Sequence, residues 1–329
     1  MGFLSLGASF LGQPVWAWLV FGAVVATLLT LDLGILHRKS REIPVGESLL
    51  LSGGYIAVAL LFGGWIWWSQ GAQPGIDFLT GYLVEKSLSL DNVFVISLIF
   101  ATLAIPRPLQ HRVLFYGILG VLIMRAVIIG FGTSIVTQFA WVLFVFGGFL
   151  MFTGIKMLFV AENPAAMADS RVLRFLRKHL RVTDQLRGEA FFWRESGPTG
   201  MGTAWHATPL FLALVMVETI DLVFAVDSVP AVLAITTDPY IVYTSNIFAV
   251  LGLRALYFAL AASVHRFHYL KYALGLVLVF IGAKIFVGHA FGKIDPAVSL
   301  GVTFSLLAGG ILFSIWKTRG TRGLALARD

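Results

Sequence analysis

The sequence predicts an all-α polytopic membrane protein with nine transmembrane helices. Of its 329 residues, 58% are apolar and 12% are charged, and the mean hydropathy is +0.87. The charged fraction is about half that of an average soluble domain. A compact soluble chain must still cover its surface with polar groups. This composition therefore excludes a soluble globular enzyme, a disordered protein and a fibrous protein.

Nine apolar stretches are long enough to cross a bilayer, which takes about 20 helical residues. None shows the alternation of apolar and polar residues expected of a barrel strand. The predicted spans are 15–36, 48–68, 77–103, 111–130, 138–160, 207–236, 241–262, 270–288 and 296–316. Because residues 1–14 contain no Lys or Arg and the first span carries Asp32, we do not expect a cleavable signal peptide at the start.

The basic residues indicate the orientation of the chain in the membrane. The connections after odd-numbered spans, together with the C-terminal tail, carry 18 of the 24 Lys and Arg residues, whereas the connections on the other side carry Lys293 alone. Because cytoplasmic loops collect Lys and Arg, we expect the N-terminus outside and the C-terminus in the cytoplasm. The same distribution explains the net charge of +7 without a nucleic-acid partner.

The longest connection, 161–206, is predicted to be a cytoplasmic basic loop with seven Lys and Arg residues. Within it, Ser170–Arg181 alternates bases with apolar residues in the manner of an amphipathic helix. Such a helix lies on an anionic membrane surface, which is the alternative interpretation of this loop. The loop is also a candidate docking surface for protein partners.

Two segments of the chain resemble each other. The segment EKSLSLDNVFV begins at Glu85, and DLVFAVDSVPA begins at Asp221. In each, the first acid is followed six residues later by Asp and then by a small polar residue. Further along, VLIMRA aligns Arg125 with Arg254 in VLGLRA, and FTGIKMLF (152–159) aligns with FIGAKIFV.

The similarity predicts an internal repeat in which spans 3–5 (77–160) correspond to spans 6–8 (207–288). Span 296–316 is then an extra C-terminal helix. Because each unit has an odd number of spans, the second copy lies upside down relative to the first. Inverted repeats of this kind form the framework of many secondary transporters, with the substrate site near the membrane midplane.

The predicted spans contain acidic residues, and each costs at least roughly 2.5–3.5 kcal/mol at the bilayer centre. These acids are Asp32, Glu85, Asp91, Glu218, Asp221 and Asp227. They must face one another or a wet cavity. Lys86, Arg125 and Arg254 are candidate structural counter-ions. An open alternative is that the acids only pair with these bases to hold the bundle together.

Helical spacing indicates which polar groups converge. Glu85 and Asn92 are seven residues apart and share one face of a helix, and Asp221 and Ser228 repeat this face. Pro230 lacks an N–H, so it frees the carbonyl of the residue four positions earlier and favours local unwinding of span 6. The predicted ligand oxygens come from Glu85, Asp91, Asn92, Asp221, Asp227 and Ser228, with Glu218, the Val226 carbonyl and Asp32 as further candidates.

These are carboxylate, amide, hydroxyl and carbonyl oxygens, which suit Mn²⁺, Mg²⁺ or Ca²⁺. The chain has no cysteine, and its seven histidines lie outside the spans or at their edges. A soft-metal substrate such as Cu⁺ is therefore disfavoured. An intramembrane hydrolase is also disfavoured, because the spans contain neither a nucleophile–base pair nor a His-ligated metal motif.

These residues resemble the TerC family of integral membrane proteins, and most of all its Alx-like branch. The resemblance covers nearly the whole chain, through LDLGILHRK (31–39), GYLVEKSLSLDNVFV (81–95), FGGFLMFTGIKM (146–157) and the stretch 221–258. It implies a nine-span bacterial inner-membrane protein related to the lysine-exporter superfamily. It further implies cation efflux, chiefly of manganese. The family's intramembrane acids correspond to Glu85, Asp91, Asp221 and Asp227 here, and Asn92 and Ser228 also match.

Two functions follow as expectations. In the first, the protein exports Mn²⁺ in exchange for H⁺, and the ion passes between spans 3 and 6 as one repeat rocks against the other. Mn²⁺ is then the transported substrate, and no resident cofactor is expected. In the second, the protein is a membrane assembly factor that binds partner proteins through loop 161–206. It would support the metallation of exported enzymes, a role to which family members have also been linked.

Overall fold

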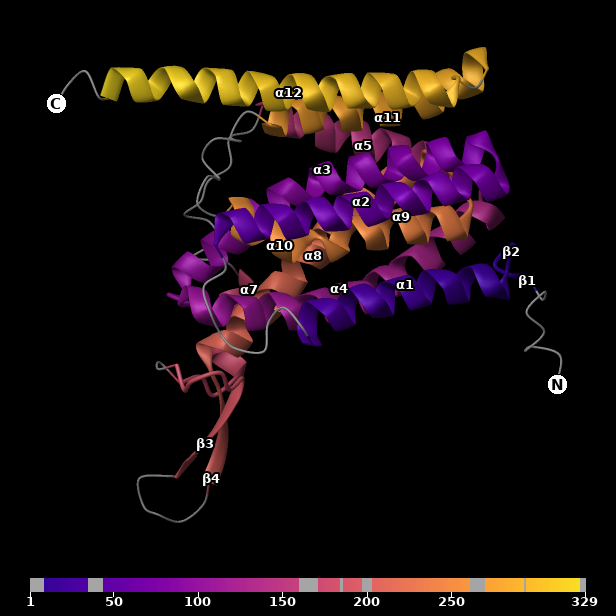
Figure 1. Ribbon diagram of the computed structural model, residues 1–329. Coiled ribbons are helices and arrows are strands. Elements are labelled where there is room, and N and C mark those ends of the chain that lie inside the picture. The colour runs from indigo at the N-terminus through magenta and orange to yellow at the C-terminus, as the bar shows by residue number, and fades with distance from the viewer. Residues whose placement is uncertain are drawn as a thin grey trace, which may run out of the picture.

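The protein is a bundle of long helices that run roughly alongside one another, as the computed structural model in Figure 1 shows. The structure describes residues 9–34, 44–159, 171–183, 186–196, 203–260, 270–292 and 294–325. The long helices are α1 (Val15–Gly34), α2 (Val45–Gln70), α3 (Ala72–Thr102), α4 (Arg107–Gln138), α5 (Val142–Phe159), α8 (Pro209–Leu233), α9 (Pro239–Leu251), α10 (Leu253–Leu260), α11 (Leu270–Phe291) and α12 (Pro296–Ala325).

Every predicted span overlaps a helix, and span 7 is divided into α9 and α10 at Gly252. Within the described residues, seven helical segments are long and apolar enough to cross a membrane: α2, α4, α5, α8, α9 with α10, α11 and α12. The described apolar part of α1 is shorter, and α3 carries several charged residues. The protein is therefore a mostly helical, polytopic membrane protein, while the number of nine spans stays a prediction.

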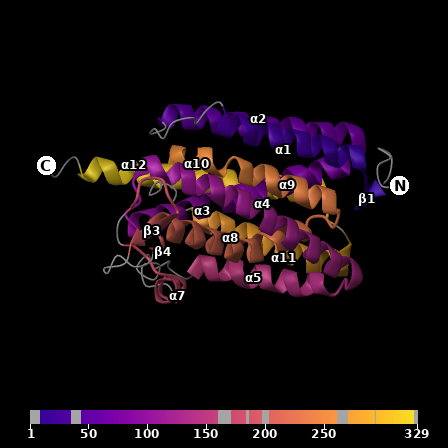
Figure 2. The same ribbon diagram turned by 90° about the horizontal axis from the view of Figure 1, so that it is seen from below.

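Short elements cap the two ends of the bundle. Strands β1 (Ser9–Phe10) and β2 (Gln13–Pro14) pair at one end, next to the start of α1. Helix α7 (Arg171–His179) and the antiparallel hairpin of β3 (Phe192–Ser196) and β4 (Thr203–Ala207) lie at the opposite end (Figures 1 and 2).

The basic loop is thus partly folded. Its helix was predicted from the sequence, but its hairpin was not. In α7, the Leu173 side chain is buried in the same apolar cluster as Met216 of α8, whereas Phe175 is exposed. The loop is also joined to the start of α8, because the Thr208 hydroxyl donates to the Ala190 carbonyl at 2.7 Å.

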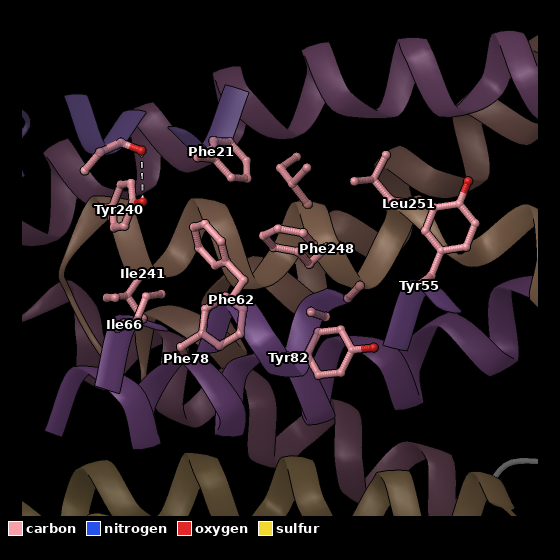
Figure 3. Packing of buried hydrophobic residues seen from close by; sticks show 14 of the residues in the cluster. Phe21, Tyr55, Phe62, Ile66, Phe78, Tyr82, Tyr240, Ile241, Phe248 and Leu251 are labelled. Carbon is pink, nitrogen blue, oxygen red and sulfur yellow. Dashed lines mark hydrogen bonds between the residues drawn. The ribbon is translucent and has the colours of Figure 1, made fainter. Parts of the chain in front are cut away.

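An aromatic core attaches α1 and α2 to α3 and α9. Phe62 of α2 lies against Phe248 of α9 with ring centroids 4.7 Å apart, and Phe21 and Phe78 border the same pair (Figure 3). The Tyr240 hydroxyl donates to the Ala17 carbonyl of α1 at 3.1 Å, the hydrogen bond drawn in Figure 3. The first two helices are therefore fixed to the side of the bundle that carries the polar site described below.

Helices α5 and α11 form the most extensive helix–helix contact of the protein. They cross in antiparallel fashion, backbone against backbone, at two pairs of glycines: Gly147 with Gly282, and Gly154 with Gly275. A β-carbon on Gly147 would lie 3.1 Å from the Gly282 carbonyl oxygen, and one on Gly275 would lie 2.8 Å from that of Gly154. Small residues permit such close approach between membrane helices.

Candidate functional site

Arg125 lies at the centre of a buried polar cluster where α3, α4, α8 and α9 meet. Its side chain is 1% exposed. Its Nη1 forms an ion pair with the Glu85 carboxylate of α3 and donates to Asn246 Oδ1 of α9 at 2.6 Å. The same nitrogen lies 3.5 Å from Ser228 Oγ of α8. One guanidinium from α4 thus contacts polar groups on three other helices.

A second contact joins the two acidic helices directly. Asn92 Nδ2 of α3 donates to Asp221 Oδ1 of α8 at 3.2 Å. Asp221 also lies within electrostatic range of Arg125 and Glu85. The positions that sequence analysis placed on one face of each helix, Glu85 and Asn92 on α3 and Asp221 and Ser228 on α8, therefore meet in a single cluster.

The local sequence explains this close crossing. Ser89 lies between Glu85 and Asn92, and Ala225 lies between Asp221 and Ser228. Both small side chains are 1% exposed, and Ser89 satisfies its own hydroxyl by donating to the carbonyl four residues earlier at 2.8 Å. With no bulky side chain at these positions, α3 and α8 can approach and bring their polar groups together.

Several buried polar atoms of the cluster have no hydrogen-bond partner among the residues whose side chains the structure describes. They are Glu85 Oε2, Asn92 Oδ1, Arg125 Nε and Asn246 Nδ2. A buried polar group without a partner carries a substantial desolvation penalty. Two of these atoms are acceptor oxygens, on residues 1% and 3% exposed. They are the type of ligand that hard divalent cations take in proteins.

Glu218 extends the acidic face of α8 by one turn, as its spacing predicts. It acts electrostatically on Asp221. Its carboxylate packs against Gly120 of α4 so closely that a β-carbon at position 120 would overlap it. A glycine at this position of α4 therefore makes room for a carboxylate between the helices.

Three predicted ligands lie where their side chains are outside the described part of the structure. The backbones of Asp32, Asp91 and Asp227 belong to α1, α3 and α8 respectively, but their side-chain positions are not defined. Among the residues that the structure describes, no group of three or more His, Asp or Glu is arranged to hold a metal ion. The metal site stays a prediction, and in this state one of its expected ligands, Glu85, is engaged by a guanidinium.

The unwinding expected beside Pro230 is not observed. Helix α8 continues through the proline from Pro209 to Leu233, so the prediction of a broken span 6 is wrong. A proline removes one backbone donor, but helices packed around it can hold the rest of the turn in place. Val229 and Val232, which flank Pro230, are both buried in an apolar cluster of the bundle. The Val226 side chain is exposed, on another side of α8.

The other predicted counter-ions lie elsewhere in the bundle interior. Lys86 donates from Nζ to the Ala249 carbonyl of α9 at 3.1 Å, and Arg254 of α10 is buried. Asn246, which contacts Arg125, was not among the predicted site residues. The sequence feature that could have identified it is an amide side chain in the middle of an apolar span, in the motif YTSNIFAV, because a polar side chain at that depth needs a partner.

Comparison with known proteins agrees with this architecture. The family described as "Integral membrane protein TerC family" matches residues 70–322. An uncharacterized membrane protein of Rickettsia felis is 47% identical over 299 residues, covering 91% of this chain and 97% of the relative. A protein of Escherichia coli K12 named "Putative membrane-bound redox modulator Alx" is 44% identical over 314 residues, covering 93% and 95%. No solved structure matches the chain. With a family match over most of its length and relatives this similar, the chain belongs to the TerC family of integral membrane proteins.

Proposed function

We propose that this protein exports a divalent metal cation, chiefly Mn²⁺, across the bacterial inner membrane in exchange for H⁺. The observation that carries the proposal is the buried cluster between α3 and α8. It brings Glu85 and Asp221 beside the Arg125 guanidinium, with Glu218 in electrostatic contact with Asp221. Among the described residues, two of its buried acceptor oxygens, Glu85 Oε2 and Asn92 Oδ1, have no hydrogen-bond partner. Buried negative charge that its neighbours do not balance favours a bound cation.

The pattern of helix contacts supports an inverted repeat. Each helix of the first unit packs against its counterpart in the second: α3 on α8, α4 on α9 with α10, and α5 on α11. The sequence alignment of the two units equates Gly147 with Gly275 and Gly154 with Gly282. The observed pairs join Gly147 to Gly282 and Gly154 to Gly275. A two-fold axis between the units would place each glycine of one unit against the counterpart of the other glycine, which is the pairing observed.

The polar cluster follows the same rule. Glu85 corresponds to Asp221 and Asn92 to Ser228 in the alignment. Asn92 contacts Asp221, and Arg125 links Glu85 to Ser228. The cluster therefore lies on the supposed two-fold axis, which is where inverted-repeat transporters bind their substrates.

The chemistry of the donors favours a hard cation. Carboxylate and amide oxygens are the preferred ligands of Mn²⁺, Mg²⁺ and Ca²⁺, and Asp91 and Asp227 are further proposed ligands. The same carboxylates can bind either protons or a metal ion, so protons entering the site would replace the departing ion. The Alx relatives are named for redox modulation, but this chain has no cysteine and therefore no thiol for such a role.

Transport in proteoliposomes tests this function. The full chain would be reconstituted, a pH gradient imposed, and Mn²⁺, Mg²⁺ and Ca²⁺ fluxes measured separately. We expect Mn²⁺ flux that depends on the gradient. Glu85→Gln and Asp221→Asn should each lower it about 10-fold or more, because each removes a charged ligand, and even a hydrogen bond to a charged group is worth about 1.5–3 kcal/mol.

The matched control is Glu189→Gln, which removes the same charge from a carboxylate whose side chain is 45% exposed. It should leave the flux unchanged. If Glu85→Gln and Asp221→Asn transport Mn²⁺ as the unchanged protein does, the proposed function is wrong.

A second candidate function is the binding of partner proteins during assembly of exported metalloenzymes. The β3–β4 hairpin favours it, because it projects from the bundle (Figure 1) and exposes Trp193 and Trp205, with Arg194 over the Trp205 ring at 4.7 Å. Replacing residues 193–206 by a flexible linker separates the two functions. Intact Mn²⁺ flux with lost partner recovery supports a docking role for the hairpin in addition to transport, and flux is then the function of the bundle.

A further inference from the structure

We propose that the Arg125 guanidinium is a tethered cation that occupies the Glu85 carboxylate when no metal ion is bound and leaves it when one binds. This inference rests on the proposed function and concerns the same site. It assigns to Arg125 the role of an internal competitor, which is more than that of a fixed counter-ion.

The partners of Arg125 fall into two kinds. Of its hydrogen-bonding partners, Glu85 belongs to the first unit and is charged, whereas Asn246 and Ser228 belong to the second unit and are neutral. Asp221 of the second unit adds an attractive charge at longer range. If a metal ion takes the carboxylate, the amide oxygen 2.6 Å away can still hold the guanidinium. Arg125 Nε donates to none of the described residues, so the arginine keeps a donor that a shifted position can use.

The acceptors of the site are incompletely used while the arginine is in place. Glu85 Oε2 and Asn92 Oδ1 are buried and have no hydrogen-bond partner within the described part of the chain, although Arg125 holds the other oxygen of Glu85. A divalent cation would satisfy such oxygens. It would also be repelled by a guanidinium on the same carboxylate, because the low dielectric of a buried site strengthens the interaction between like charges. The ion and the arginine therefore exclude each other from Glu85.

This exclusion links ion binding to the junction between the two units. Arg125 of α4, paired with α3, is hydrogen-bonded to α9 and lies beside Ser228 of α8, so its position holds the units in one arrangement. An ion that takes the Glu85 carboxylate breaks the link that runs from α3 through Arg125 to the second unit, while Arg125 stays on Asn246. The binding energy of the ion can then drive a rearrangement of the two units, and without an ion this energy is missing. An exchanger needs such a link, because its empty form must not rearrange on its own.

Mn²⁺ binding to the full chain in lipid nanodiscs, measured by calorimetry, tests the competition. A protein whose binding-competent state is about 10% populated or less gains about 10-fold or more in affinity when the competing state is removed. We therefore expect Arg125→Gln to bind Mn²⁺ at least about 10-fold more tightly than the unchanged protein. Arg125→Lys, which keeps a cation, should stay within about threefold.

Arg112→Gln is the matched control, because it removes a guanidinium from the same helix where the partner is the exposed Glu189. It should leave the Mn²⁺ affinity unchanged. If Arg125 only supports the structure, Arg125→Gln weakens binding or leaves it as it was, and the competition is refuted. If the unchanged protein itself binds no Mn²⁺, the proposed function fails instead.

A measurement on the unchanged sequence covers the case in which Arg125→Gln does not fold. Infrared difference spectra would be recorded on protein carrying ¹³C in its arginine guanidinium groups, with and without Mn²⁺. We expect a Mn²⁺-induced shift of an arginine band that persists in Arg112→Gln and is absent in Arg125→Lys. Carboxylate bands that respond to Mn²⁺ while the arginine bands stay fixed would overturn the inference and leave the metal site intact.

Discussion

The contact between α5 and α11 can be tested by adding one methyl group. In Gly154→Ala, the new β-carbon would lie 2.5 Å from the Gly275 carbonyl oxygen and 2.8 Å from Val279 Cγ2. The backbone oxygen cannot move aside as a flexible side chain can, so the two helices must separate. Overpacking of this kind costs about 1–3 kcal/mol.

Gly148→Ala is the matched control on the same helix, because nothing lies within 4 Å of its new β-carbon. Alanine favours a helix over glycine by about 1 kcal/mol, so this variant should be neutral or slightly stabilised. The difference in unfolding temperature between the two variants, measured by tryptophan fluorescence of the detergent-solubilised full chain, isolates the packing cost.

The proposed inverted repeat adds a second expectation to the same experiment. Gly282 is the counterpart of Gly154, and a β-carbon on it would lie 2.5 Å from the Gly147 carbonyl oxygen. Gly282→Ala should therefore lower the unfolding temperature about as much as Gly154→Ala does. If Gly154→Ala unfolds at the same temperature as Gly148→Ala, the backbones do not touch and the reasoning is refuted.

Three further changes probe the packing and the surface, each followed by thermal unfolding of the full chain. Phe248→Ala removes a fully buried ring from the aromatic core and should destabilise the protein by about 3–5 kcal/mol; a loss below 1 kcal/mol would contradict the packing of Figure 3. Tyr240→Phe removes the hydrogen bond to the Ala17 carbonyl and should cost about 1 kcal/mol, while an unchanged stability would mean that this bond is not formed. Arg112→Gln breaks the partly exposed ion pair with Glu189 and should cost at most about 1 kcal/mol, and less in high salt; a larger, salt-independent loss would show another role.

The sequence predicted the helices better than their ends. Span 4 was predicted as 111–130, but α4 runs from Arg107 to Gln138. Its first turns carry bases, and its last turns carry hydroxyl residues that look polar in the sequence. Within the helix, the Thr133 hydroxyl donates a hydrogen bond to the Ile129 carbonyl at 2.8 Å. Because this polar group is satisfied by the helix itself, the threonine does not end the helix.

The candidate site was predictable where it depends on helical spacing. The shared faces of Glu85 with Asn92 and of Asp221 with Ser228 follow from a seven-residue separation, and the structure brings these residues together. The choice of partners was not predictable, because the rotation and depth of α9 decide that Asn246 reaches Arg125. The continuity of α8 through its proline depends on the packing of neighbouring helices, which spacing within one segment does not contain.

The two glycine contacts of α5 and α11 limit how this protein can change shape. They lie seven residues apart, about 10 Å along the helix axis, so a tilt that preserves one contact opens the other. We therefore expect the two helices to move as one rigid element, although they belong to different units of the proposed repeat. If the protein transports as proposed, the boundary between its moving parts is set by the α5–α11 pair and does not coincide with the boundary between the two proposed repeat units.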